Sequence, residues 1–179
     1  AIVLALAAGL WLAGASMPPG SIGLVTSDYY DVMSYHLQVP REFFEEGRIT
    51  ALPHNTYSHY PLGGEMLFLL GMCLKGGPWA GAYAAKFTHG LWGVLAVAAA
   101  VTAVPDPQRK RWTALLLATV PLALSVSWLA FVELSELAYL AIALAWLRTW
   151  HTRPTWRSTA MVGLACGGAC ATKYLSVGL

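Results

Sequence analysis

The chain has 179 residues, of which 57% are hydrophobic and only 11% are charged. Soluble domains usually carry about 25% charged residues, so this composition excludes an ordinary soluble domain and indicates a polytopic membrane protein. The formal net charge of +2 is small and comes with no basic patch, so we expect no nucleic-acid partner. The three cysteines lack the spacing of a disulfide framework or a zinc site.

The apolar segments predict an all-α fold, a polytopic bundle of transmembrane helices. A span needs about 20 apolar residues. We expect spans at about residues 1–16, 79–104, 112–131, 135–150 and 158–179. The first is short, and we take the sequence to be a piece of a longer protein, cut within its first apolar segment. Pro121 predicts a kink in its span, and Gly163, Gly167 and Gly168 predict close helix packing in the last one.

The polar connection over residues 17–60 predicts an outer loop that contains short interfacial helices. Asp28 suits the cap of a first helix, with Asp31 three residues further on as in a capping box. Pro40 suits the first turn of a second helix, and Gly47 suits its end. On the second helix we expect the aromatic side chains on the membrane surface and the charged ones in water: Phe43 and Phe44 against Arg41, Glu42, Glu45 and Glu46.

Lysine and arginine residues in short turns predict the orientation. Two basic turns, at residues 109–111 and 148–157, are expected on the cytoplasmic side, and the more acidic loop 17–60 is expected outside. An odd number of crossings must then separate the loop from the first basic turn, but two apolar segments lie between them. The shorter one, residues 61–75, carries Glu65. We therefore predict that it lies in the outer interface or re-enters.

This topology gathers polar side chains at the outer side of the membrane. An ionisable group within a span is costly and usually functional. Carboxylates and lysines together indicate a site for a phosphate-bearing, lipid-linked substrate. His36 and His59 could each bind an acceptor substrate, a donor substrate or a metal ion, and these alternatives stay open. One possible metal site is a divalent ion at Asp31 and His59. The full set is Asp28, Asp31, His36, His59, Lys86, Glu133, Glu136 and Lys173.

Each of these residues also has a purely structural interpretation. Asp28 is better explained as a helix cap, and Asp31 alternatively as a carboxylate at a helix terminus. Lys86 and Lys173 can instead extend toward the interface. The tyrosines of the loop suit an aromatic belt as well as a sugar. His89 is interpreted as a hydrogen-bonded helix-packing residue.

Four segments, in order, carry a resemblance. Residues 31–40, DVMSYHLQVP, fit the pattern D-x-x-x-Y-H-L-x-x-P, which contains Asp31, Tyr35 and His36. Residues 57–62, YSHYPL, lead into the next apolar segment, SELA follows at 135–138, and a Gly-rich stretch over 163–174 ends in ATKY. Together they are similar to the C-superfamily membrane glycosyltransferases, which include lipid A aminoarabinose transferases and protein O-mannosyltransferases. Two departures are Val32, where many members have a second acidic residue, and Glu136, where an Asp is usual.

The resemblance implies a sugar transfer from a polyprenyl-phosphate donor to a lipid, polysaccharide or protein acceptor. It implies a bacterial inner-membrane protein with its active site on the periplasmic side, among membrane lipids. Asp31 would be the catalytic base, because an acceptor hydroxyl is a poor nucleophile until a carboxylate accepts its proton. Lys173 and Lys86 would bind the departing phosphate, and Tyr35, His36, His59, Glu136 and Asp28 would contribute to substrate binding. A single base implies inversion at the sugar carbon.

The competing hypothesis is a non-enzymatic polytopic protein, such as a transporter subunit, whose intramembrane charges line a path. Transporter sites lie near the membrane midplane and often come with internal repeats. The sequence shows no repeat, and its charges favour the outer side. We therefore adopt the glycosyltransferase as the working hypothesis.

Overall fold

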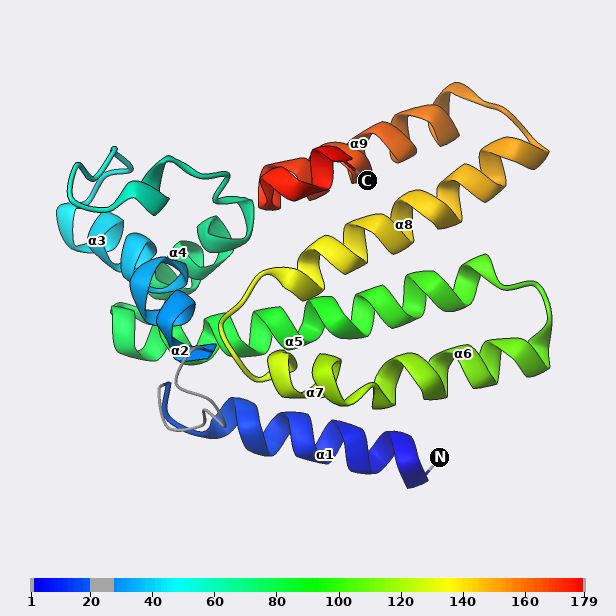
Figure 1. The fold of residues 1–179 in the computed structure, drawn as a ribbon, viewed down its shortest axis with the longest axis horizontal. Coiled ribbons are helices and arrows are strands. Elements are labelled where there is room, and N and C mark those ends of the chain that lie inside the picture. Colours follow the sequence, from blue (N-terminus) through cyan, green and yellow to red (C-terminus); the bar gives the residue numbers. More distant parts are fainter. Residues whose placement is uncertain (1, 20–27, 179) are drawn as a thin grey trace.

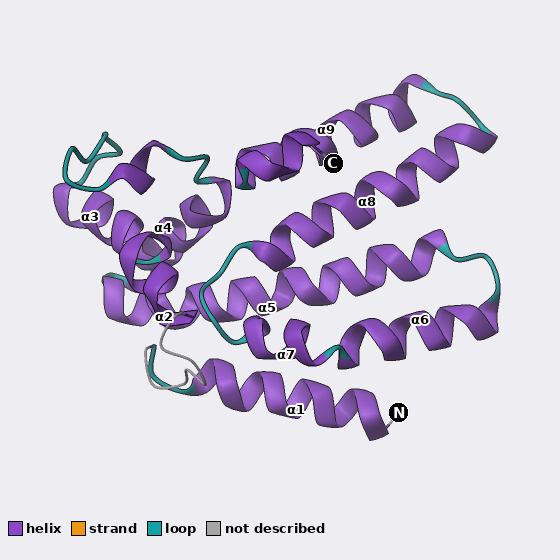
Figure 2. Ribbon diagram, in the orientation of Figure 1, coloured by secondary structure: helices purple, strands orange, loops and turns teal. Residues whose placement is uncertain are grey.

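The computed structural model describes residues 2–19 and 28–178, and all regular secondary structure within these ranges is helical (Figure 2). The predicted all-α fold is therefore confirmed for this part of the chain. Among the described helices, α5 (Pro78–Ala103) is the one that is long and apolar enough to cross a membrane. Helix α1 (Ile2–Ser16) is apolar but shorter.

Helix α1 and the helices from α5 onward lie alongside one another and form a bundle (Figure 1). Besides α1 and α5 these are α6 (Pro107–Thr119), α7 (Pro121–Ser127), α8 (Glu133–Thr152) and α9 (Trp156–Thr172). Helices α1, α7 and α9 finish at the same end of the bundle at which α5 and α8 begin (Figure 1). We call this the loop end, because α2, α3 and α4 all gather there.

The break between α6 and α7 lies at the predicted kink. Helix α6 ends at Thr119, Val120 is not helical, and Pro121 begins α7. Proline has no N–H to continue the helical ladder, and its ring disfavours a helical conformation of the residue before it. The kink at Pro121 is therefore confirmed, as a full break.

The loop helices follow the predicted pair with one addition. Helix α2 (Asp28–Asp31) continues directly into a π-helix, η1 (Val32–His36), and α3 (Gln38–Glu46) follows after Leu37. Pro40 lies in the first turn of α3, and Gly47 ends this helix with a φ of 67°, as predicted. The left-handed conformation at Gly47 carries little steric penalty because glycine has no Cβ. The side chain of Asp28 lies outside the described residues, so its predicted cap is not seen.

Phe43 does not rest on a membrane surface, which corrects the prediction for α3. Its side chain is only 3% exposed and packs with Val39 and Leu52 inside the loop region. Phe44 packs partly buried against the main core. The apolar stripe of α3 is therefore used to bind the loop to itself and to the bundle.

The charged side of α3 is only partly in water. Arg41 and Glu45 are exposed and pair at 2.8 Å. Glu42, by contrast, is 16% exposed, accepts a hydrogen bond from Gln38 at 2.6 Å and lies 2.8 Å from His54 Nε2. Glu42 thus fastens the segment after α3 to the helix rather than facing water.

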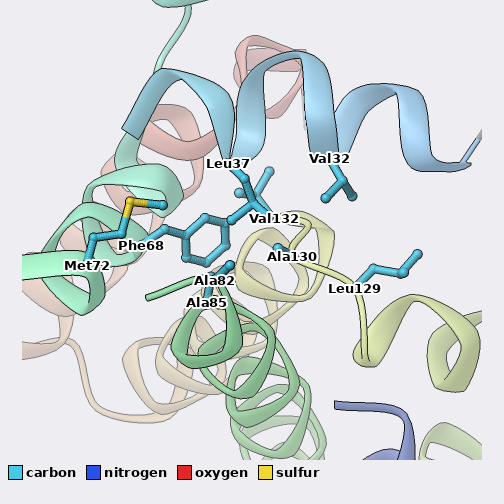
Figure 3. Close-up of a cluster of buried hydrophobic side chains, with 9 residues drawn as sticks. All are labelled: Val32, Leu37, Phe68, Met72, Ala82, Ala85, Leu129, Ala130 and Val132. Atoms are coloured by element: carbon cyan, nitrogen blue, oxygen red, sulfur yellow. The ribbon is translucent and has the colours of Figure 1, made fainter. Parts of the chain in front are cut away.

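The main hydrophobic core lies at the loop end, where η1, α4, α5 and residues 129–132 meet (Figure 3). Helix α4 (Gly63–Lys75) supplies Phe68 and Met72 to it. A Cβ on Gly63 would lie 2.7 Å from the Ala171 carbonyl oxygen of α9, and one on Gly81 of α5 would lie 2.4 Å from the Met72 side chain. The beginning of α4 therefore contacts the end of α9, while its last turns contact the start of α5. Both ends of α4 thus stay at the loop end.

The last segment differs from the prediction in two ways. Helix α9 ends at Thr172, so Lys173 is extended rather than helical, and a 3-10 helix, η3 (Tyr174–Gly178), follows. Of the three glycines expected to allow close packing, only Gly168 does so within the described residues: a Cβ there would lie 2.4 Å from the Tyr139 ring. Gly163 and Gly167 have nothing within 4 Å of a built Cβ.

Candidate functional site at the loop end

The π-helix η1 groups the polar residues of the first motif. Its wide turn is closed by the Leu37 N–H, which donates to the Val32 carbonyl five residues earlier at 2.9 Å. In such a turn residues four or five apart fall on one side, and π-turns are frequent at functional sites. Asp31, at the head of the turn, is thereby grouped with Tyr35 and His36. Asp31 is partly exposed and His36 is buried.

A buried ion pair connects η1 to α4. His36 Nδ1 lies 2.6 Å from Glu65 Oε1, and each side chain is 1% exposed. Within the described residues, His36 Nε2 and Glu65 Oε2 have no hydrogen-bond partner. The prediction placed His36 in the site, whereas Glu65 entered the sequence argument only as a reason against a membrane span. Its role as the partner of His36 was missed.

A second ion pair connects α9 to α8. Lys173 Nζ donates to Glu133 Oε1 at 2.5 Å, and the other oxygen, Oε2, accepts from the Val132 N–H at 3.1 Å. The lysine is 29% exposed and the carboxylate 37% exposed, so both are within reach of a ligand. Lys173 therefore lies at the loop end, and its ammonium is held by the first residue of α8.

Tyr35 lies beside His36, with the centroids of the two rings 4.0 Å apart. Its own burial, and then the charges of Asp31, Glu133 and Glu65, hold the pKa of its hydroxyl well above the usual range. A carboxylate raises this pKa because it disfavours a second negative charge nearby. The charges of three carboxylates, from α2, α8 and α4, thus act together on one hydroxyl, which stays protonated and can donate a hydrogen bond.

A row of tyrosines runs along the site from η1 to the segment after α9. Tyr35 stacks on Tyr57 with ring centroids 4.6 Å apart, Tyr57 meets Tyr60 at 5.4 Å, and Tyr60 meets Tyr174 at 5.7 Å. Tyr60 and Tyr174 are 45% and 59% exposed. The row gives the site an aromatic rim that is open to solvent or lipid.

Glu136 and His59 lie at the margin of the site. Glu136 accepts a hydrogen bond from Ser176 Oγ at 2.5 Å, which ties η3 to the first turn of α8. His59 is exposed, and its backbone carbonyl accepts from the Tyr174 hydroxyl at 3.3 Å. Residues 2–19 and 28–178 contain no group of three His, Cys, Asp or Glu side chains arranged to hold a metal ion. A metal at Asp31 and His59 stays a prediction.

Lys86 has a different environment from the predicted one. Its ammonium donates to the carbonyl oxygens of Gly14 at 3.0 Å and Met17 at 2.6 Å, at the end of α1. A cation is favourable there, because the last carbonyls of a helix carry partial negative charge. Lys173 follows α9, on the opposite side of the bundle from α1 (Figure 1). The structure therefore separates the two lysines, and Lys86 is not part of the site.

His89 anchors the segment that carries Glu133. It is 0% exposed. Its Nδ1 lies 3.0 Å from the Leu129 carbonyl, and its Nε2 accepts from the Leu134 N–H at 3.1 Å. These partners require a neutral ring with its hydrogen on Nδ1. The interpretation of His89 as a hydrogen-bonded packing residue is confirmed, and the bonds fix the turn between α7 and α8.

The sequence contains weak signals for the two residues that were missed or given little weight. A single glutamate in an otherwise apolar segment, as Glu65 is, must find a buried partner or leave the segment. Glu133, at the first position of α8, suits the positive end of the helix dipole. This role alone explains a glutamate at that position, so the sequence gives no reason to expect its pairing with Lys173.

Comparison of the chain with protein-family models, with curated proteins and with solved structures finds no match.

Proposed function

We propose that this chain is a membrane-embedded glycosyltransferase that moves a sugar from a polyprenyl-phosphate donor to an acceptor at the outer membrane surface. One observation carries the proposal. A partly exposed carboxylate, Asp31, and a partly exposed cation, Lys173, lie at the same end of an apolar bundle. The charges of Asp31 and of Glu133, the partner of Lys173, both act on the Tyr35 hydroxyl. A base and a phosphate-binding cation are the two groups that such a transfer needs.

In the proposed topology the loop end faces outward. The helices α1, α5, α6 with α7, α8 and α9 are the spans, and α4 stays in the outer interface. The basic turns at residues 109–111 and 148–157 lie at the opposite end of the bundle, where the positive-inside rule expects them (Figure 1). Large apolar side chains exposed on the bundle supply the surface for lipid: Leu6, Leu10, Leu91, Leu116, Leu144 and Leu164.

The proposed chemistry assigns one step to each of these groups. The Asp31 carboxylate accepts the proton of the acceptor hydroxyl, whose oxygen attacks the sugar carbon bonded to the phosphate. The bond from that carbon to the phosphate oxygen breaks, and the electron pair leaves with the lipid phosphate. Lys173 stabilises the charge that develops on the leaving group. Direct displacement inverts the configuration at the sugar carbon, and the protonated Tyr35 hydroxyl donates a hydrogen bond to a substrate oxygen.

The test is a transfer assay with a radiolabelled polyprenyl-phosphate sugar and a panel of lipid, polysaccharide and peptide acceptors. Asp31→Asn should lower turnover by about 10²–10⁴-fold, because general-base catalysis typically contributes this much. The control is Asp106→Asn, which replaces a carboxylate that caps α6 at the far end of the bundle. Asparagine caps a helix about as well as aspartate, so this variant should keep its activity. Full turnover in Asp31→Asn would exclude Asp31 as the base.

A further inference from the structure

The proposed mechanism leaves the buried His36–Glu65 pair unused. One bond of 2.6 Å joins Nδ1 to Oε1, while Nε2 and Oε2 have no partner among the residues that the structure describes. Buried polar atoms in folded proteins nearly always have a partner, so an exception calls for an explanation. The imidazole lies against the rings of Tyr35 and Phe131, with centroids 4.0 and 5.4 Å away.

The burial of the pair limits which hydrogens it can carry. An uncompensated charge in a site that is 1% exposed is costly, so the pair should be neutral as a whole. Two neutral states place a hydrogen on Nε2: an imidazolium with a carboxylate, and a neutral imidazole whose Nδ1 accepts from the Oε1 hydroxyl of a carboxylic acid. A third neutral state leaves Nε2 bare, with the hydrogen of the carboxylic acid on Oε2 and an Nδ1–H that donates to Oε1. The states therefore differ in whether the unpartnered hydrogen-bond donor is Nε2 of His36 or Oε2 of Glu65.

We infer that His36 presents its Nε2–H as a hydrogen-bond donor to a phosphate oxygen of the lipid-linked substrate, and that Glu65 is the residue that positions it. The choice of ligand rests on the proposed function. His36 is the last residue of η1, and Asp31 directly precedes this π-helix. The Glu133 carboxylate that holds Lys173 is near enough for its charge to interact with His36. A donor and a cation on adjacent elements suit the oxygens of one phosphate.

The ligand oxygen reaches Nε2 only when a covering ring moves, because His36 is buried. Tyr35 and Phe131 are the rings in contact, and both are only partly buried. Tyr35 also stacks on Tyr57, so its movement would open the tyrosine row at the same time. Binding of the phosphate and rearrangement of the aromatic rim are therefore expected together.

The hydrogen on Nε2 is tested without any ligand. The full chain, purified in detergent with ¹⁵N-labelled histidine, is compared by NMR with its His36→Asn variant to assign the His36 signals. We expect the Nε2 resonance of a protonated nitrogen at neutral pH. A Nε2 resonance typical of a bare nitrogen would overturn the inference, whatever the chain catalyses.

The ligand is tested with undecaprenyl phosphate, in which no sugar is present, and with inorganic phosphate as a second probe. In His36→Asn the side-chain amide nitrogen takes the position of Nδ1 and keeps a hydrogen bond to Glu65, but the hydrogen-bond donor at Nε2 is lost. In His36→Gln the amide nitrogen takes the position of Nε2. We expect the asparagine variant to bind undecaprenyl phosphate about tenfold more weakly, as for the loss of one charge-assisted hydrogen bond, and the glutamine variant to recover most of the affinity.

Each outcome decides a different point. Equal binding by the wild type and His36→Asn would overturn the role of His36 and leave the proposed function intact. Binding of inorganic phosphate as tightly as undecaprenyl phosphate would overturn the assignment to a lipid-linked substrate. If the wild-type chain binds neither probe, both the proposed function and the assignment of a phosphate ligand are overturned. The NMR experiment would still show whether Nε2 carries a hydrogen.

Discussion

At the scale of single residues, the site is built from pairs that cross between elements. Lys173 is held by Glu133, 40 residues earlier, and His36 by Glu65, 29 residues later. In the first pair both side chains are partly exposed, and in the second each side chain has one buried atom without a partner among the described residues. Under the proposed function, the pairs position the groups that bind the ligand and offset part of the cost of burying charge.

Lys173→Ala should weaken binding of undecaprenyl phosphate by at least about tenfold, because the phosphate loses a charge-assisted partner. Lys75→Ala is the control, since Lys75 ends α4 at the same end of the bundle and is exposed. Its removal should leave binding nearly unchanged. Equilibrium binding to lipid nanodiscs measures both variants, and an equal loss in the two would mean that only general surface charge matters.

His89→Ala should destabilise the fold, because the Leu129 carbonyl and the Leu134 N–H lose their partner in a buried position. A buried donor or acceptor left without a partner costs about 1–3 kcal/mol. His151→Ala removes an exposed histidine near the end of α8 and should have little effect. Thermal unfolding in detergent compares the two. A midpoint for His89→Ala equal to that of the control would contradict the anchoring role.

At the scale of elements, the helix breaks and ends that depend on a single residue's backbone geometry could be predicted from the sequence. Pro121 and Gly47 act through their own backbone geometry, so the break after α6 and the end of α3 could be expected from the sequence. The burial of Phe43 could not be predicted, because it depends on packing against Leu52, a residue of the segment after α3. The π-turn of η1, which contacts α4 through the His36–Glu65 pair, likewise could not be predicted from its five residues.

The two glycines of α9 give a matched test of helix packing. Gly163→Ala should stabilise the chain by about 0.5–1 kcal/mol, because the position is open and alanine is the better helix former. Gly168→Ala gains the same helix propensity but places its Cβ 2.4 Å from the Tyr139 ring, so the ring must move. The free energy of unfolding of Gly168→Ala should therefore fall below that of Gly163→Ala. The reverse order would mean that α8 and α9 are less closely packed than described.

At the scale of the whole molecule, the apolar composition predicted the helical class, and the orientation that the basic turns indicate stays a prediction. The composition of the site was harder to predict. Asp31, Tyr35, His36 and Lys173 were expected together and lie at the loop end, because all four belong to motifs. Lys86 was expected with them from its depth along α5 alone. Depth does not determine the direction of a side chain, and Lys86 turns toward the end of α1.

The proposed orientation is tested by labelling single cysteines from outside intact cells. In a chain with its native cysteines replaced by serine, Ala51→Cys should react with an impermeant reagent and Gln108→Cys should not. Both positions are exposed, so accessibility within the fold does not separate them. Gln108→Cys should become reactive once the cells are opened. Labelling of Gln108→Cys in intact cells would reverse the orientation and place the loop end in the cytoplasm.

The π-turn of η1 makes the site sensitive to chain length as well as to residue type. Met33 is 55% exposed, so its side chain can be exchanged at little cost. Deleting it is different, because the turn would lose the extra residue that the Leu37-to-Val32 bond encloses. The turn would then close as an ordinary α-helical turn, with Asp31 four residues before His36 and still on the same side of the helix. An added residue has a different effect, because a regular helix turns about 100° per residue and Asp31 would rotate by about that angle against His36. This segment should therefore tolerate substitutions, and the loss of one residue, far better than an insertion.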